Sequence, residues 1–420
     1  MILSDLSWNI RGTLGRKFLA LAQQYDDVVD FSLGDPDIPT PDGICEAAYK
    51  CIREHRTRYT ASAGILQLRE AIATYESQKA GMDIKAENVA VTVGATEAIH
   101  LAFRMLLNPG DEVIIIGPTW SQCPNNVLLC GAKPVMAETF TEGFLPDLAY
   151  VRSLINHRTR IIVINSPNNP TGTVYPVELL KEIANLAEEK GLYVFSDEVY
   201  STLVYDKPFH SISAFYPAEH LIVFNSFSKA FCMTGWRVGY VIGEPHFIKR
   251  LAKMQENVAV CASGISQWAA LEAVTHAENY VTPIRNTFLA RRKTLVDALE
   301  GIPGIRYHIP DAAFYLFTDI SATGLDSRSF CFSLLEKEHV SLTPGLAFGD
   351  SFDGYVRLAF TLEDDVSREG ARRIRHFNGK SVKFSACAMV WRKVTVSLHQ
   401  KLKRTVPCAT QISTSTPSET

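Results

Sequence analysis

The stretch RIIVINSPNNPTGTVYPVELLKEIANLAEEKGLYVFSDEVY, residues 160–200, decides the fold. Two short runs rich in β-branched and aromatic residues, Arg160–Ile164 and Leu192–Ser196, flank an amphipathic helical stretch. This order predicts a strand, a crossover helix and a second, parallel strand. The same alternation runs from Asn88 to about Glu256, which predicts a mostly parallel sheet covered by helices. The other strands expected in this sheet are Val89–Val93, Glu112–Ile116, Lys133–Met136, Leu221–Phe224 and Arg237–Ile242.

The pattern changes after Cys261, where long helical stretches reach about Leu299 and short strands with helices between them follow. This predicts a second, smaller α+β unit with a long helix as a bridge. Its expected strands are Ile305–Ile309, Phe314–Asp319, Val340–Thr343 and Tyr355–Phe360. We therefore expect a large domain over 31–285, a small domain over 286–378, one helical stretch within 1–30 that packs on the small domain, and a disordered, basic, Ser/Thr-rich tail over 379–420.

The composition excludes several classes of protein. The 420 residues are 46% hydrophobic, and 42 basic residues against 45 acidic ones give a net charge of −3. No global positive field exists to hold nucleic acid or an anionic membrane, so we expect neither as a partner. The N-terminus lacks a signal-peptide pattern, no apolar run could span a bilayer, and the nine cysteines form no C-x-x-C pair. We expect a cytoplasmic protein, and no metal site.

The segment NSFSKAFCMTGWRVGY, residues 225–240, carries the most chemical information. Lys229 stands in an apolar setting just past an expected strand, where burial would lower its pKa and make it an amine nucleophile toward an aldehyde. The hydroxyls of Ser226 and Ser228 and the guanidinium of Arg237 suit a phosphate dianion. Two other interpretations are open at this point: a solvated surface lysine, and the S-x-x-K of a serine acyl enzyme, whose SDN and KTG partners are absent.

Three other motifs follow expected strands. In VGATE, the backbone N–H groups of Ala95 and Thr96 and the Thr96 hydroxyl open a helix, where they form an anion site or an ordinary helix cap. In SPNNPTG, the many turn residues require a fixed loop, and Asn169 offers a side-chain donor. In SDEVY, Asp197 ends a very apolar strand, where a carboxylate is costly unless a cation meets it. A structural salt bridge is the alternative for Asp197.

Together these motifs provide a phosphate cradle, an amine nucleophile, an acid suited to a cationic ring nitrogen, and two donors, Asn169 and Tyr200, suited to a phenolate. Pyridoxal 5′-phosphate has these four features. From about Leu33 to His376 the chain resembles the class I aminotransferases among the fold-type I pyridoxal-phosphate enzymes, with motifs like those of aspartate, aromatic and arginine–pyruvate transaminases. The resemblance implies an α/β fold-type I transferase, with a large, mostly parallel sheet domain and a smaller α+β domain.

The resemblance also implies a role for each motif residue. Lys229 would bind the cofactor aldehyde covalently and shuttle the proton, while Asp197 would keep the ring nitrogen protonated. Tyr200 and Asn169 would bond the ring oxygen, and Trp120 would stack on the ring face.

The remaining roles implied by the resemblance concern the phosphate and the substrate. Five residues of this chain would hold the phosphate, joined by Tyr59 from a partner subunit: Ala95, Thr96, Ser226, Ser228 and Arg237. Arg357 would bind the substrate α-carboxylate, with Gly34 closing over it and Trp120 and Asn169 also in contact.

The expected activity is a ping-pong transfer of an amino group between an L-amino acid and a 2-oxo acid, catalysed by a homodimer. A carbon–sulfur lyase or an aminocyclopropane-carboxylate synthase-like lyase is the alternative, since the same scaffold and lysine serve both. A third interpretation is a regulator that uses such a domain as a sensor. The chain departs from the family pattern at Asp311–Tyr315, DAAFY, where Ala312 adds a methyl group at a position that is usually glycine.

Overall fold

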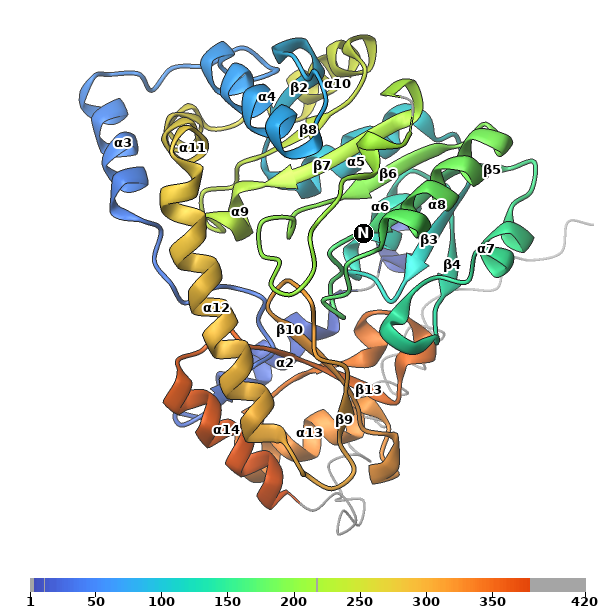
Figure 1. The fold of residues 1–420 in the computed structure, drawn as a ribbon, viewed down its shortest axis with the longest axis vertical. Coiled ribbons are helices and arrows are strands. Elements are labelled where there is room, and N and C mark those ends of the chain that lie inside the picture. Colours follow the sequence, from blue (N-terminus) through green and yellow to red (C-terminus); the bar gives the residue numbers. More distant parts are fainter. Residues whose placement is uncertain (1–3, 11, 217, 378–420) are drawn as a thin grey trace, which may run out of the picture. The chain divides into compact units, whose positions relative to one another are not determined.

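A seven-stranded sheet forms the centre of the computed structural model, which describes residues 4–10, 12–216 and 218–377 (Figure 1). Six strands are parallel, and β8 runs antiparallel to both of its neighbours. The predicted tail, 379–420, lies outside the described residues. In spatial order the strands are β2 (Val89–Thr92), β8 (Gly239–Ile242), β7 (Leu221–Ser226), β6 (Tyr193–Asp197), β5 (Thr159–Asn165), β3 (Glu112–Gly117) and β4 (Lys133–Glu138).

Both faces of this sheet are covered by helices, because consecutive strand residues point to opposite faces and both sets are apolar. In β3, Val113 and Ile115 pack toward one layer, and Ile114 and Ile116 toward the other. The first layer consists of α5 (Gly94–Leu106), α6 (Gln122–Leu129) and α10 (Pro245–Val258). The second consists of α7 (Leu148–Leu154) and α8 (Val177–Lys190).

Helix α8 shows why the sequence folds this way locally. Its buried side chains Leu180, Ile183, Ala184 and Ala187 recur at the helical spacing and form one apolar stripe against the sheet. The helix ends at Gly191, whose left-handed backbone (φ 61°) is easily adopted without a Cβ atom. The crossover helix expected between β5 and β6 is therefore confirmed.

A second sheet, of four antiparallel strands, lies in the C-terminal third of the described chain. Its order is β12 (Thr343–Pro344), β13 (Tyr355–Ala359), β10 (Tyr315–Asp319) and β9 (Arg306–Tyr307). The apolar core on this sheet includes side chains from α12 (Ala277–Leu299), α13 (Ser327–Glu338) and α14 (Asp364–His376). In Figure 1, α12 runs as one long helix from beside α11 (Gly264–Thr275) to beside α14, with Pro283 in its first third.

A third apolar cluster lies at the β2 edge of the large sheet. It joins α3 (Asp42–Arg53) and α4 (Leu66–Ala80) to α11 and to the residues around α9 (Phe227–Ala230). This cluster fixes α4 beside the strands β7 and β8, a placement that matters for the site below.

The N-terminal region and the strand that pairs with it differ from the sequence prediction. Two helices, α1 (Asp5–Asn9) and α2 (Leu14–Ala22), replace the single expected helical stretch. The predicted strand Val340–Thr343 is divided, because β11 (Val340–Ser341) pairs in parallel with β1 (Val29–Asp30) while β12 joins the four-stranded sheet. Helix α2 contacts both β11 and β12. The chain between β1 and α3 is thereby held against the second sheet, opposite the carboxyl ends of the large-sheet strands.

Candidate active site

A cavity of about 330 Å³ opens at the carboxyl ends of the large-sheet strands. Ligands bind at this edge in α/β proteins, because loops from several strands converge there. Of the thirteen residues predicted for the site, all but Tyr59 line this cavity: Gly34, Ala95, Thr96, Trp120, Asn169, Asp197, Tyr200, Ser226, Ser228, Lys229, Arg237 and Arg357. The structure thus brings together motifs that lie more than 300 residues apart in the sequence.

Lys229 stands one turn beyond β7, in the short helix α9. Its Nζ donates a hydrogen bond to the carbonyl oxygen of Gly34 at 2.7 Å and lies 5.6 Å from the ring centroid of Phe314. Burial lowers the pKa of the Lys229 ammonium to about 8, and the guanidinium groups of Arg357 and Arg237 act in the same direction. A solvated surface lysine is therefore the wrong interpretation. An appreciable fraction of the amine is neutral near pH 7.

Asp197 is the last residue of β6 and lines the cavity. Burial raises the pKa of its carboxyl group to about 7, although Oδ1 accepts a hydrogen bond from the backbone N–H of Val199 at 3.3 Å. Asp197 forms no ion pair with a side chain of the described residues. The salt-bridge alternative thus has no partner in this part of the chain, and the carboxylate is available to a cationic ligand group.

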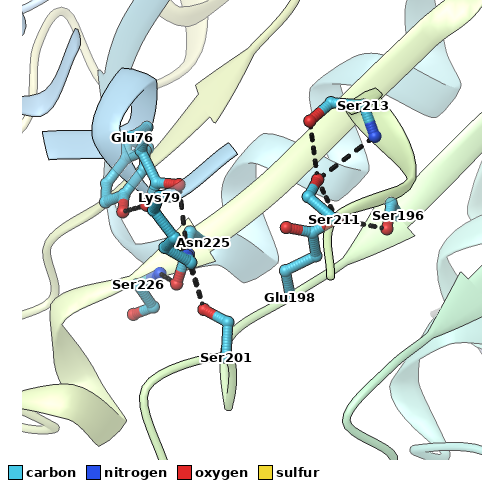
Figure 2. A network of polar contacts seen from close by, with 10 residues as sticks. Glu76, Lys79, Ser196, Glu198, Ser201, Ser211, Ser213, Asn225 and Ser226 are labelled. Carbon is cyan, nitrogen blue, oxygen red and sulfur yellow. Dashed lines mark hydrogen bonds and ion pairs between the residues drawn. The ribbon is translucent and has the colours of Figure 1, made fainter. Parts of the chain in front are cut away.

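The neighbours of Asp197 hold the end of β6 in place. Because side chains alternate along a strand, Ser196 and Glu198 point away from the cavity. The buried Oε1 of Glu198 accepts hydrogen bonds from the hydroxyls of Ser196, at 2.9 Å, and Ser211, at 2.8 Å (Figure 2). This pair of bonds fixes the backbone on both sides of Asp197.

The predicted phosphate cradle lies where α5 begins beside Arg237. A Cβ atom on Gly94 would stand 2.5 Å from Nη2 of Arg237, so only a glycine allows the guanidinium to lie against the start of this helix. Ser226 Oγ donates to Ser228 Oγ at 2.9 Å, and both hydroxyls line the cavity. A guanidinium, two hydroxyls and a helix N-terminus are a donor set that suits a phosphate dianion.

Arg357, in β13, faces the cavity from the second sheet. Its Nη1 donates to Oδ1 of Asn169 at 3.0 Å and its Nη2 to the carbonyl oxygen of Ser32 at 2.7 Å. The guanidinium lies 4.3 Å from the ring centroid of Tyr315, while Nε is buried and has no hydrogen-bond partner among the described residues. Nη2 also donates to Thr343 Oγ1 at 3.4 Å. All three acceptors are neutral, so none of them compensates the positive charge of this buried group. A carboxylate ligand would compensate it.

Sequence reasoning missed Tyr315, although it ends the DAAFY motif. Its hydroxyl shares a hydrogen bond with that of Tyr200 at 2.9 Å, and its ring supports Arg357. A Cβ atom on Gly34 would stand 2.2 Å from the Tyr315 hydroxyl, which explains why glycine is needed there. Nothing in the strand pattern alone distinguishes Tyr315 from a core residue.

The backbone of Ala312 lies against that of Gly172. Ala312 N–H donates to the carbonyl oxygen of Gly172 at 3.0 Å, and a Cβ atom on Gly172 would stand 2.6 Å from the Ala312 oxygen. The close approach therefore depends on Gly172, and Ala312 itself is fully buried without lining the cavity.

Tyr59 is the one predicted site residue outside this cavity. Its side chain is 85% exposed. Because the predicted role of Tyr59 lies in a partner subunit, it stays a prediction.

Comparisons with known proteins identify the class of enzyme. Residues 26–374 match the family model "Aminotransferase class I and II", so the chain belongs to this family.

Individual relatives agree with this assignment. The chain is 40% identical to an aspartate aminotransferase of Pyrococcus horikoshii over 86% of this chain and 93% of that protein. It is also 40% identical to a probable N-acetyl-LL-diaminopimelate aminotransferase of Bacillus subtilis, over 86% and 92% of the two chains. A solved structure of Thermus thermophilus aspartate aminotransferase with maleate superposes with a TM-score of 0.85 at 36% identity, covering 90% of this chain and 99% of that one. These names support amino transfer and not the lyase alternative.

Two further findings concern the described residues as a whole. Among them, no helix combines the length and the apolar character that a bilayer crossing needs. Seven cysteines within the described ranges are free thiols.

We predict that Arg357→Lys raises KM for every amino acid and oxo acid by about 10- to 100-fold, since one charge-assisted hydrogen bond to a carboxylate is worth roughly 1.5–3 kcal/mol. Steady-state kinetics with several substrates measure this. Arg292→Lys is the matched control, because Arg292 is also buried but pairs with Asp206 outside the cavity. An Arg357→Lys variant with unchanged KM values and a lowered Tm would show that Arg357 stabilises the fold and does not bind the substrate.

Proposed function

We propose that the protein is a pyridoxal 5′-phosphate-dependent aminotransferase that acts as a homodimer. The observation that carries the cofactor proposal is the set of groups in one cavity: a lysine with a lowered pKa, a carboxylate without an ion-pair partner, and a guanidinium beside two hydroxyls. These groups match the aldehyde, the ring nitrogen and the phosphate of the cofactor. The site predicted from the sequence therefore fits the group that the family implies.

When bound, the cofactor supplies an electron sink for the carbon that carries the amino group. Asp197 would hold a proton on the ring nitrogen, because a buried carboxylate without a cation is costly. Asn169 and Tyr200 would orient the ring, and Trp120 would cover it from water. Lys229, as a neutral amine, would take and return the proton at the substrate α-carbon.

The homodimer proposal rests on exposed apolar side chains at one part of the surface. Tyr59 lies close in sequence to the exposed Leu66, and Gly264 packs against the backbone of Arg58. The exposed Val258 and Val260 precede this contact in the sequence. Such a surface suits a subunit contact that carries Tyr59 to the phosphate of the partner. We also propose a large domain over 31–285, a small domain over 286–378 and a cytoplasmic location.

The charges of the cavity suggest the substrate class. Four cationic side chains line it, Arg16, Lys229, Arg237 and Arg357, against the single carboxylate of Asp197. The last three have proposed partners in the aldehyde, the phosphate and the α-carboxylate. Arg16, in α2, is exposed, and no hydrogen bond or ion pair of its side chain occurs within the described structure.

A second acidic group on the substrate would give Arg16 a partner. This agrees with the names of several relatives, which are called aspartate aminotransferases, and with maleate, a dicarboxylate, in the T. thermophilus structure. We therefore propose acidic amino acids and their 2-oxo acids as substrates.

Borohydride treatment of the yellow enzyme should attach the cofactor irreversibly to the peptide that contains Lys229, because the neutral amine condenses with an aldehyde. Mass spectrometry of the digest measures this. Lys79, a largely buried lysine outside the cavity, is the internal control and should stay unmodified. A protein that stays colourless with added cofactor would refute the proposed function.

Asp197→Ala should lower kcat by roughly 10²–10³-fold or more, as the loss of a preorganised charge at the reacting group does elsewhere. Cofactor binding should weaken far less, because the phosphate cradle is unchanged. The two effects are separated by single-turnover kinetics and a cofactor titration. Near-normal turnover of this variant would contradict the role of Asp197.

Arg16→Gln should lower kcat/KM for aspartate and glutamate by about tenfold, the effect of one partly exposed charge-assisted contact, and leave alanine within about twofold. Lys17→Gln is the control, because Lys17 is the next residue and does not line the cavity. Equal losses with acidic and neutral donors would refute the substrate class while leaving the aminotransferase proposal intact.

A further inference from the structure

A cluster of buried polar side chains lies next to Ser226, outside the cavity. It consists of Glu76 and Lys79 on α4, Asn225 on β7, Ser201, and Tyr240 on β8. Figure 2 shows the first four of these residues beside Ser226. None of the five lines the cavity, and Glu76 and Asn225 are 3% and 5% exposed. The proposed reaction does not use them. A buried carboxylate is costly, so its contacts need an explanation.

Asn225 connects this cluster to the cavity. Its Oδ1 accepts a hydrogen bond from the backbone N–H of Ser226 at 2.8 Å. Its Nδ2 donates to Oε1 of Glu76 and to Oγ of Ser201, both at 3.3 Å. Ser226 in turn precedes α9, and its hydroxyl bonds that of Ser228.

Glu76 determines which way the Asn225 amide points. An ionised carboxylate only accepts hydrogen bonds, so Asn225 must turn its NH₂ toward Glu76 and its oxygen toward Ser226. Glu76 is held in place by Lys79, whose Nζ lies 3.1 Å from Oε2, and by the Tyr240 hydroxyl, which donates to Oε1. Lys79 also donates to Ser201 at 2.7 Å. The Glu76 carboxylate and the Ser226 N–H therefore favour the same orientation of the amide, and the Ser201 hydroxyl can accept from it.

We propose that Glu76 and Asn225 are positioning residues for the phosphate end of the cofactor site: Glu76 orients the Asn225 amide, and Asn225 fixes the peptide from which the Ser226 hydroxyl enters the cavity. This rests on the proposed function, because it takes the phosphate to bind at Ser226. The effect is specific to phosphate, since neither residue approaches Lys229 or Asp197 through a hydrogen bond.

The test exchanges the carboxylate of Glu76 and the amide of Asn225 between the two positions. Asn225→Asp sets a second carboxylate against Glu76 and removes the NH₂ donor, so the side chain is driven away from its place. In the double variant Glu76→Gln with Asn225→Asp, the glutamine NH₂ donates to the new carboxylate, which still accepts from Ser226 N–H. The double variant also leaves the net charge of the cluster unchanged.

The measurement is titration of the cofactor-free enzyme with pyridoxal 5′-phosphate and with pyridoxal, which has the same aldehyde and no phosphate, followed by absorbance. We expect Asn225→Asp to weaken the phosphate form by about tenfold or more and pyridoxal by less than about twofold, as one lost charge-assisted contact predicts. The double variant should recover to within about threefold of the wild type, which a double-mutant cycle makes quantitative. Glu70→Gln, an exposed change on the same helix, is the control.

Other outcomes overturn the proposal. Equal weakening of both ligands, or no recovery in the double variant, would show that the cluster only stabilises the fold. If Asn225→Asp does not fold, Ser201→Ala removes one acceptor of the Asn225 NH₂ and should weaken the phosphate form alone by about threefold, in line with a neutral hydrogen bond. No change, or equal change with pyridoxal, would refute the proposal. A wild-type enzyme that binds neither ligand would instead refute the proposed function.

Discussion

Desolvation of the Lys229 amine is the constraint on which the site depends. An ammonium group in an apolar cavity loses its hydration, and two nearby guanidinium groups disfavour its charge further. Among the described residues, the amine donates to the Gly34 carbonyl at 2.7 Å and makes no hydrogen bond to a carboxylate, while the nearby charge of Asp35 raises its pKa and so opposes the effect of burial. Burial thus lowers the pKa of the amine to about 8, and the positive charges that add to this effect are the same ones that would bind the phosphate and the substrate carboxylate. The same guanidinium groups therefore attract anions to the cavity and help to activate the nucleophile.

Much of this arrangement follows from the sequence because the fold is a parallel sheet. The carboxyl ends of parallel strands share an edge, so polar residues just after separate strands must meet. Asp197 at the end of β6, Ser226 at the end of β7 and Asn169 beyond β5 could be placed together on this ground alone. The pattern of apolar runs also predicted both ends of every strand of the large sheet to within two residues.

The parts that the sequence did not predict depend on contacts between distant segments. Tyr315 and Arg16 are ordinary members of a strand and a helix until the second sheet and α2 are brought to the cavity. The division of Val340–Thr343 into β11 and β12 is set by which partner strand each half meets, β1 or β13. A local pattern gives the length and burial of a strand but not its pairing partner. The opposite is true of Ala312, which the sequence singled out as a departure from the family pattern and which the structure shows to be a buried residue outside the cavity.

The proline within α12 has a mechanical consequence. Pro283 has no backbone N–H, so one hydrogen bond of the helix ladder is missing near the start of its 23 residues. The bending stiffness of α12 is therefore lowest at that turn, while the longer remainder, which packs on α14, behaves as a rigid lever. Pro283 lies between Val281, which packs in the apolar cluster at the β2 edge, and Ile284, which packs in the core of the second sheet. A bend of α12 at this turn would therefore change the angle between these two packed regions without disturbing the interior of either.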